Sequence, residues 1–182
     1  MSSLPALDGT SLRGIVPQRA TAALLAGALA IAVNTALLAA ADVIPLVTAH
    51  GGLLKLLKIG VGDILVRLGA GALWAQSGLP APGSTTFQSG FHVVAGLGMA
   101  LVYGMAIEPA LPGPAWRKGV IYAVVVWVAN AVVILPWLGE GFAGSRNLSL
   151  PGMAYFAAAH TVFFVLLAVL FARFRPAATR LS

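Results

Sequence analysis

Two uncharged runs joined by a proline-broken turn decide the fold: residues 85–107 read TTFQSGFHVVAGLGMALVYGMAI, residues 108–118 read EPALPGPAWRK, and residues 119–139 read GVIYAVVVWVANAVVILPWLG. Each run is long enough to cross a bilayer, which requires about 20 mainly apolar residues. Two further runs, residues 20–41 and 148–172, also lack Asp, Glu, Lys and Arg. The sequence therefore predicts an all-α polytopic membrane protein with four transmembrane helices.

The composition of the 182-residue chain supports a lipid environment. Hydrophobic residues make up 59% of it and charged residues only 9%, whereas an ordinary soluble domain has about 25% charged residues. The net charge is +6, but all eleven Lys and Arg residues lie outside the four runs. Such flanking cations are typical of membrane helices, so the lipid bilayer is the predicted partner and nucleic acid is not.

The flanking charges also predict the topology. Four crossings put seven cations on one side, namely Arg13, Arg19, Arg117, Lys118, Arg173, Arg175 and Arg180, and four on the other, namely Lys55, Lys58, Arg67 and Arg146. Because cytoplasmic loops carry the excess of Lys and Arg, we expect both termini to lie in the cytoplasm.

The predicted organisation is a cytoplasmic tail at 1–19, one transmembrane domain at 20–173 and a basic cytoplasmic tail at 174–182. The crossings are expected at about 20–41, 85–107, 119–139 and 148–172. A secretory signal is the alternative for the first run, since residues 39–41 are all Ala, as at a cleavage site. The uncharged core exceeds the roughly 7–15 residues of a signal, so we expect a retained helix.

Residues 51–75 predict an amphipathic helix in the outer interface. Wound as a helix, one stripe carries the apolar residues Leu53, Leu54, Leu57, Val61, Ile64, Leu65 and Leu68, and the opposite half carries Lys55, Lys58, Asp63 and Arg67. A fifth crossing is the alternative. It would place Asp63 and Arg67 near mid-bilayer, at roughly 2.5–3.5 kcal/mol each.

Five polar side chains in or beside the crossings are candidate ligand or proton-pathway residues: His92, Asn34, Asn130, His160 and Glu108. Ionisable groups inside a membrane are functional candidates by default. His160 and Asn130 lie at similar depth, so we expect them to form a hydrogen bond. The alternative is that the polar groups only hold helices together. For Glu108, next to basic residues, we favour a solvated interfacial acid.

Small residues predict a helix-packing interface on the second crossing. Gly96, Ala100 and Gly104 recur every four residues and therefore share one face of a helix. Such stripes let a neighbouring backbone approach closely.

The sequence carries no enzymatic signature, so we expect no enzyme. It contains no Walker loop, H-E-x-x-H, dinucleotide fingerprint or G-x-S-x-G, and it has no cysteine. No cofactor or metal is predicted, because no third ligand accompanies the two histidines at a suitable spacing. A haem between His92 and His160 is the alternative, although helical rise offsets their depths by roughly 6–8 Å.

From about His92 to Arg173 the chain resembles the YagU-like family of small bacterial inner-membrane proteins of unknown function. The residues that carry the resemblance are His92, Tyr103, Glu108, Pro112, Trp116, Gly119, Pro136 and His160. The resemblance implies a helical inner-membrane protein and brings no assigned activity.

The function expected from these observations is that of a non-catalytic accessory or scaffold subunit, packed in a homo-oligomer or a larger membrane complex. One alternative is an oligomeric transporter or channel for protons or a small solute. A haem-binding membrane subunit is the other.

Overall fold

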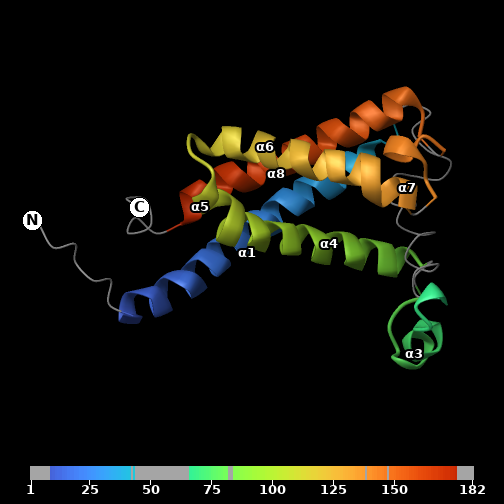
Figure 1. Ribbon diagram of the computed structural model, residues 1–182, viewed down its shortest axis with the longest axis horizontal. Coiled ribbons are helices and arrows are strands. Elements are labelled where there is room, and N and C mark those ends of the chain that lie inside the picture. Colours follow the sequence, from blue (N-terminus) through green and yellow to red (C-terminus); the bar gives the residue numbers. More distant parts are fainter. Residues whose placement is uncertain are drawn as a thin grey trace, which may run out of the picture.

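The computed structural model describes residues 9–41, 43, 66–81, 84–137, 139–146 and 148–175, with side chains from Val16 onward. Every element in these ranges is helical (Figure 1). The first crossing is α1 (Gly9–Ala40) and the fourth is α8 (Leu150–Phe174). The second consists of α4 (Thr85–Val102), η2 (Tyr103–Ile107) and α5 (Glu108–Ala110). The third consists of α6 (Ala115–Ala129), η3 (Asn130–Ile134) and α7 (Leu135–Trp137). The short helices α3 (Gly71–Gln76) and η4 (Phe142–Gly144) complete the described chain.

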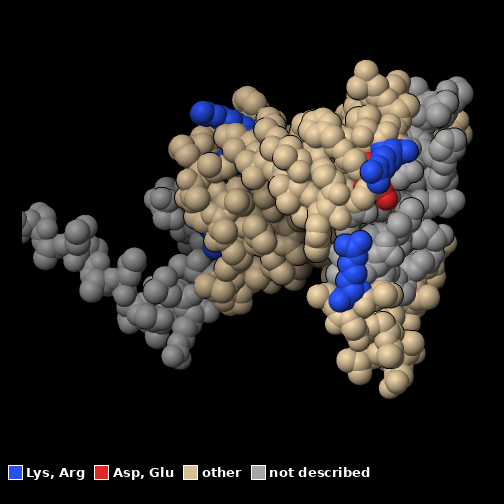
Figure 2. Space-filling model, turned by 45° about the vertical axis from the view of Figure 1, so that its right-hand side comes forward, with Lys and Arg blue, Asp and Glu red and all other residues tan. Residues whose placement is uncertain are grey.

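The predicted fold class is confirmed. Four spans in the described chain are long and apolar enough to cross a membrane: Val16–Ala40, Thr85–Ala110, Ala115–Trp137 and Leu150–Phe174. Figure 2 shows a mostly uncharged surface, with the few charged side chains gathered toward the two sides of the view. Large apolar side chains such as Leu25, Val94 and Val133 are more than half exposed, which suits a surface that faces lipid.

The bundle is built around α1 and α8. The closely packed pairs of long helices are α1 with α8, α6 with α8, and α1 with α4 (Figure 1). Buried alanines on α1, from Ala22 to Ala30, allow this proximity, and aromatic residues such as Tyr103 and Phe164 fill the centre. The second and third crossings touch near their shared turn, where Tyr103 stacks on Tyr122, and then diverge (Figure 1).

The ends of the crossings differ from the predicted bounds. α1 begins at Gly9 and contains Pro17, so the predicted tail at 1–19 is helical in its second half. A proline removes only one helical hydrogen bond, and the chain continues as helix on both sides of it. The second crossing begins after Ser84, whose side chain accepts a hydrogen bond from Phe87 N.

The predicted amphipathic helix at 51–75 falls mostly on residues 51–65, which lie outside the described chain. Within the described part it is interrupted, because Gly69 has a φ of +68°. A left-handed residue ends an α-helix, and the separate α3 begins only at Gly71. Trp74 of α3 packs edge-on against Phe87 at the start of α4.

Candidate functional site

The two asparagines of the predicted mid-membrane cluster are bonded to backbone. The amide of Asn34 is buried and donates from Nδ2 to the carbonyl of Ala159, at 2.9 Å. Asn130 donates from Nδ2 to Val126 O of its own helix, at 3.0 Å. Asn34 therefore ties α1 to α8, whereas Asn130 ties no two helices together.

The predicted hydrogen bond between Asn130 and His160 is wrong. Nδ1 of His160 lies 2.8 Å from the carbonyl of Phe156, one turn earlier in α8. The rings of His160 and Phe156 have centroids 4.1 Å apart. A helix offers such a carbonyl four residues back, so each side chain finds a partner on its own helix. Equal depth in the membrane does not make two side chains face each other.

His92 differs from the other candidates. The residue is only 9% exposed, and its Nε2 is buried without a hydrogen-bond partner. It lies on the inner face of α4, one turn before Gly96.

The small-residue stripe of the second crossing, which runs from α4 into η2, packs against α1 of the same chain. A Cβ added at Gly96 would lie 2.5 Å from Cδ1 of Ile31, and one added at Gly104 would lie 2.8 Å from Cβ of Ala23. Ala100 is fully buried. The expected packing interface of Gly96, Ala100 and Gly104 is therefore occupied inside the bundle.

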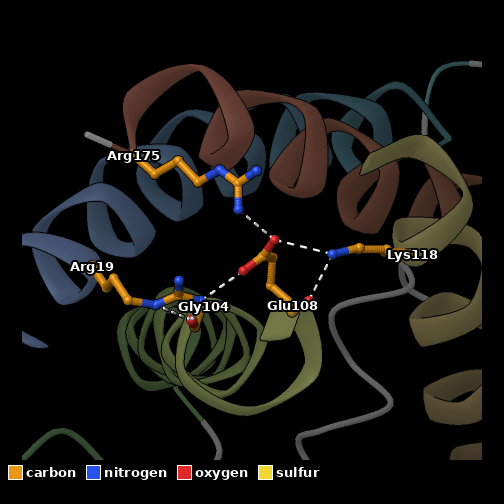
Figure 3. Close-up of polar contacts among 5 residues, drawn as sticks. All are labelled: Arg19, Gly104, Glu108, Lys118 and Arg175. Carbon is orange, nitrogen blue, oxygen red and sulfur yellow. Dashed lines mark hydrogen bonds and ion pairs between the residues drawn. The ribbon is translucent and has the colours of Figure 1, made fainter. Parts of the chain in front are cut away.

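Glu108 is not the solvated interfacial acid that we favoured from the sequence. Its side chain is only 9% exposed and forms ion pairs with cations from three other segments (Figure 3). Oε2 accepts from Arg19 at 2.7 Å, and Oε1 accepts from Lys118 at 3.0 Å and from Arg175 at 2.6 Å. We call these four residues the Glu108 cluster and this end of the molecule the Glu108 end.

A π-turn positions Arg19 in this cluster. The N–H of Glu108 bonds to Tyr103 O, five residues back, rather than to Gly104 O. The next bond of this five-residue pattern would run from the N–H of Pro109 to the carbonyl of Gly104, but proline has no N–H. The carbonyl of Gly104 is therefore left for a side chain, and Arg19 donates to it from Nη2 at 2.6 Å and from Nε at 3.2 Å.

The third crossing repeats this arrangement at its far end. Leu135 N–H bonds to Asn130 O across a second π-turn, and Pro136 follows directly. In both crossings the π-turn therefore ends at the residue that precedes a proline. The missing proline N–H accounts for the same local geometry in both.

The remaining two cations arrive from helix ends. Lys118 lies in the first turn of α6, and its Nζ also bonds to the backbone carbonyl of Glu108, at 2.7 Å. Arg175 is the C-cap of α8. The cluster thus joins α1, α5, α6 and α8, which represent all four crossings.

The Glu108 cluster surrounds one carboxylate with an excess of cations. Three cations and one carboxylate give a net charge of +2, as 3 − 1. Both carboxylate oxygens accept from these cations, one donor on Oε2 and two on Oε1. Removing one partner of a buried ion pair typically costs about 3–5 kcal/mol, because it leaves an uncompensated buried charge, so the loss of Glu108 would leave Arg19, Lys118 and Arg175 without their carboxylate.

Sequence reasoning missed the partners of Glu108 but not the acid itself. Arg19 and Arg175 lie 89 and 67 residues away from it along the chain. One signal was available: within the ranges that the structure describes, Glu108 is the only acid at the end where the chain concentrates its cations.

Few described groups could hold a metal or cofactor. No group of three or more His, Asp or Glu in the described residues is arranged to bind a metal ion. The ring nitrogens of His92 and His160 are the groups that could coordinate a haem iron. With Nδ1 of His160 facing a carbonyl, its Nε2 is the nitrogen with a lone pair for such a bond.

The chain matches no protein-family model, no curated protein and no solved structure. The resemblance to the YagU-like family therefore stays a prediction. What the fold and its surface define is the class: an all-α polytopic membrane protein, with an ion cluster where its four crossings meet.

Proposed function

We propose that the chain is a non-catalytic membrane protein that serves as an accessory or scaffold subunit of a homo-oligomer or a larger membrane complex. The observation that carries this proposal is the Glu108 cluster, which joins all four crossings at one end. At mid-membrane, Asn34, Asn130 and His160 bond to backbone carbonyls. A bundle fixed in this way favours a role in holding a shape.

The outer face of α4 is the surface that we propose for assembly. Among the long helices α4 packs closely on α1 alone, so its opposite face is open. That face carries Gly90 and Gly98, where an added Cβ would meet nothing within 4 Å, together with the exposed Val94. Small residues on an open face allow another helix to approach closely.

The test is the mass of the assembly in native nanodiscs. We expect the wild-type particle to exceed one copy of the chain. Val94→Trp, on the open face of α4, should reduce the assembly. Val125→Trp should not reduce it, although Val125 on α6 is 59% exposed and Val94 is 69% exposed. A single copy in the wild type, without another subunit, would contradict the proposal.

A proton or small-solute pathway is the second candidate, supported by the unpartnered Nε2 of His92. Purified protein in liposomes with a pH-sensitive dye distinguishes the two. A scaffold predicts the same proton leak as empty liposomes, whereas a pathway predicts a leak that His92→Gln abolishes. An absorption spectrum of the purified protein tests the haem alternative, which requires a Soret band that is lost in His160→Ala.

We further propose that the Glu108 end faces the cytoplasm of a bacterial inner membrane, with both termini there. The described part of this end carries Arg19, Arg117, Lys118, Arg173 and Arg175 against Glu108, as expected for a cytoplasmic side. Reporter fusions after Pro112 and at the C-terminus should report the cytoplasm, and fusions after Pro80 and Gly144 the periplasm. A C-terminal reporter on the outer side would contradict this orientation.

A further inference from the structure

The Glu108 end has more positive charge than its carboxylate can neutralise. Arg117 and Arg173 are exposed there, and neither is in an ion pair with any acid in the described ranges. Five described cations and one acid leave an excess of +4, as 5 − 1. An anion from outside the described chain would therefore be attracted to this end.

The cations lie where the apolar spans end. Arg117 and Lys118 are in the first turn of the third span, which starts at Ala115, and Arg173 and Arg175 flank the end of the fourth, at Phe174. The ends of transmembrane spans coincide with the headgroup region of the bilayer. Trp116, 57% exposed, provides an amphipathic ring of the kind that settles at this level.

Arg175 has a donor that the cluster does not use. Its Nη1 donates to Glu108 at 2.6 Å, but its Nε is buried without a hydrogen-bond partner. The side chain as a whole is 21% exposed, so a ligand would meet other atoms of the side chain before Nε. Guanidinium groups bind phosphate oxygens through two parallel N–H donors. Lys118 reaches the same carboxylate oxygen, which places a second cation beside Arg175.

We propose that Arg175 and Lys118, together with the exposed Arg117 and Arg173, bind the phosphate headgroup of an anionic phospholipid at the Glu108 end. Clusters of Lys and Arg beside the ends of transmembrane spans attract the headgroups of anionic lipids. The apolar outer faces of α6 and α8 continue from this site, and the acyl chains would lie along them. The proposal requires only that the chain spans a membrane and does not depend on the scaffold role.

The experiment measures binding of phosphatidylglycerol and phosphatidylcholine to the purified full chain in neutral detergent, by thermal unfolding and by retained lipid in native mass spectrometry. The test variant combines Arg117→Gln with Arg173→Gln, which leaves the Glu108 cluster intact. A control variant combines Arg67→Gln with Arg146→Gln, which removes two exposed cations from the other end and, at Arg146, a hydrogen bond to the carbonyl of Gly139; its lipid binding is therefore compared with its own lipid-free state. Inorganic phosphate at equal anion concentration is the third arm.

We expect phosphatidylglycerol, but not phosphatidylcholine, to raise the unfolding temperature of the wild type. Each basic residue near a membrane surface strengthens binding about fivefold, so the test variant should bind about 25-fold more weakly. The control variant should bind like the wild type. Equal binding of both lipids, or equal losses in both variants, would overturn the proposal. The same gain from inorganic phosphate would mean a free-anion site and would overturn the assignment to a lipid.

Discussion

Replacing Gly119 with alanine tests the packing of the two most closely associated helices. Gly119 lies in the first turns of α6, and a Cβ added there would lie 2.7 Å from the carbonyl oxygen of Phe164 and 2.8 Å from Cα of Val165. Both are backbone atoms of α8, so no side-chain rotation can relieve the contact. The helices would have to separate.

The required separation sets the magnitude. Ordinary contact begins at 3.4 Å, so the shift needed is about 0.7 Å, as 3.4 − 2.7. Overpacking of this kind typically costs about 1–3 kcal/mol, and a rigid backbone neighbour favours the upper end. Alanine recovers up to about 1 kcal/mol of helix propensity. Gly119→Ala should therefore lower the free energy of unfolding by about 2 kcal/mol.

Gly71→Ala is the control, because an added Cβ at Gly71, in α3, would meet only Cγ2 of Val66 at 3.9 Å, an ordinary contact. The same change in residue type should there be neutral or stabilising by up to about 1 kcal/mol. The assay is unfolding in mixed micelles by increasing SDS, followed by tryptophan fluorescence. Equal effects of the two substitutions would refute the inferred contact between α6 and α8.

Two further predictions concern polar contacts, and the same unfolding assay measures them. Asn34→Ala should lower the free energy of unfolding by about 0.6 and at most about 1.7 kcal/mol, because it removes a hydrogen bond between two helices. Asn130→Ala should change it by less than about 0.5 kcal/mol, because its bond lies within one helix; equal costs would contradict this difference between the two asparagines. Arg19→Gln should cost less in a Pro109→Ala background than in the wild type, because alanine supplies an N–H that can bond the carbonyl of Gly104. Identical costs in both backgrounds would mean that the π-turn does not leave that carbonyl for Arg19.

The four crossings could be predicted because lipid imposes a simple requirement on sequence. A helix in a bilayer needs about 20 residues with few charges, and each of the four runs meets it without interruption. The start of α1 could not be read in the same way. Pro17 resembles a helix breaker locally, yet the helix, which begins at Gly9, continues through it.

The candidate site was predicted less well, because depth along a helix follows from sequence while direction around the bundle does not. Asn130 and His160 were placed at similar depth, but each bonds to its own helix. Glu108 was interpreted as a solvated acid because exposed ion pairs contribute little free energy. Its burial depends on α1 and the end of α8, which sequence proximity does not bring near it. The prolines did carry a signal, since both π-turns end one residue before a proline.

A double-mutant cycle between Glu108 and Arg175 tests the central claim, that one buried carboxylate joins the crossings at the Glu108 end. Glu108→Gln alone should cost about 3–5 kcal/mol. Its effect should be smaller when Arg175→Gln is already present, with a coupling free energy of about 0.5–3 kcal/mol. Arg173→Gln, two residues away on an exposed side chain, should show coupling below about 0.5 kcal/mol. Additive effects of Glu108→Gln and Arg175→Gln would contradict the cluster.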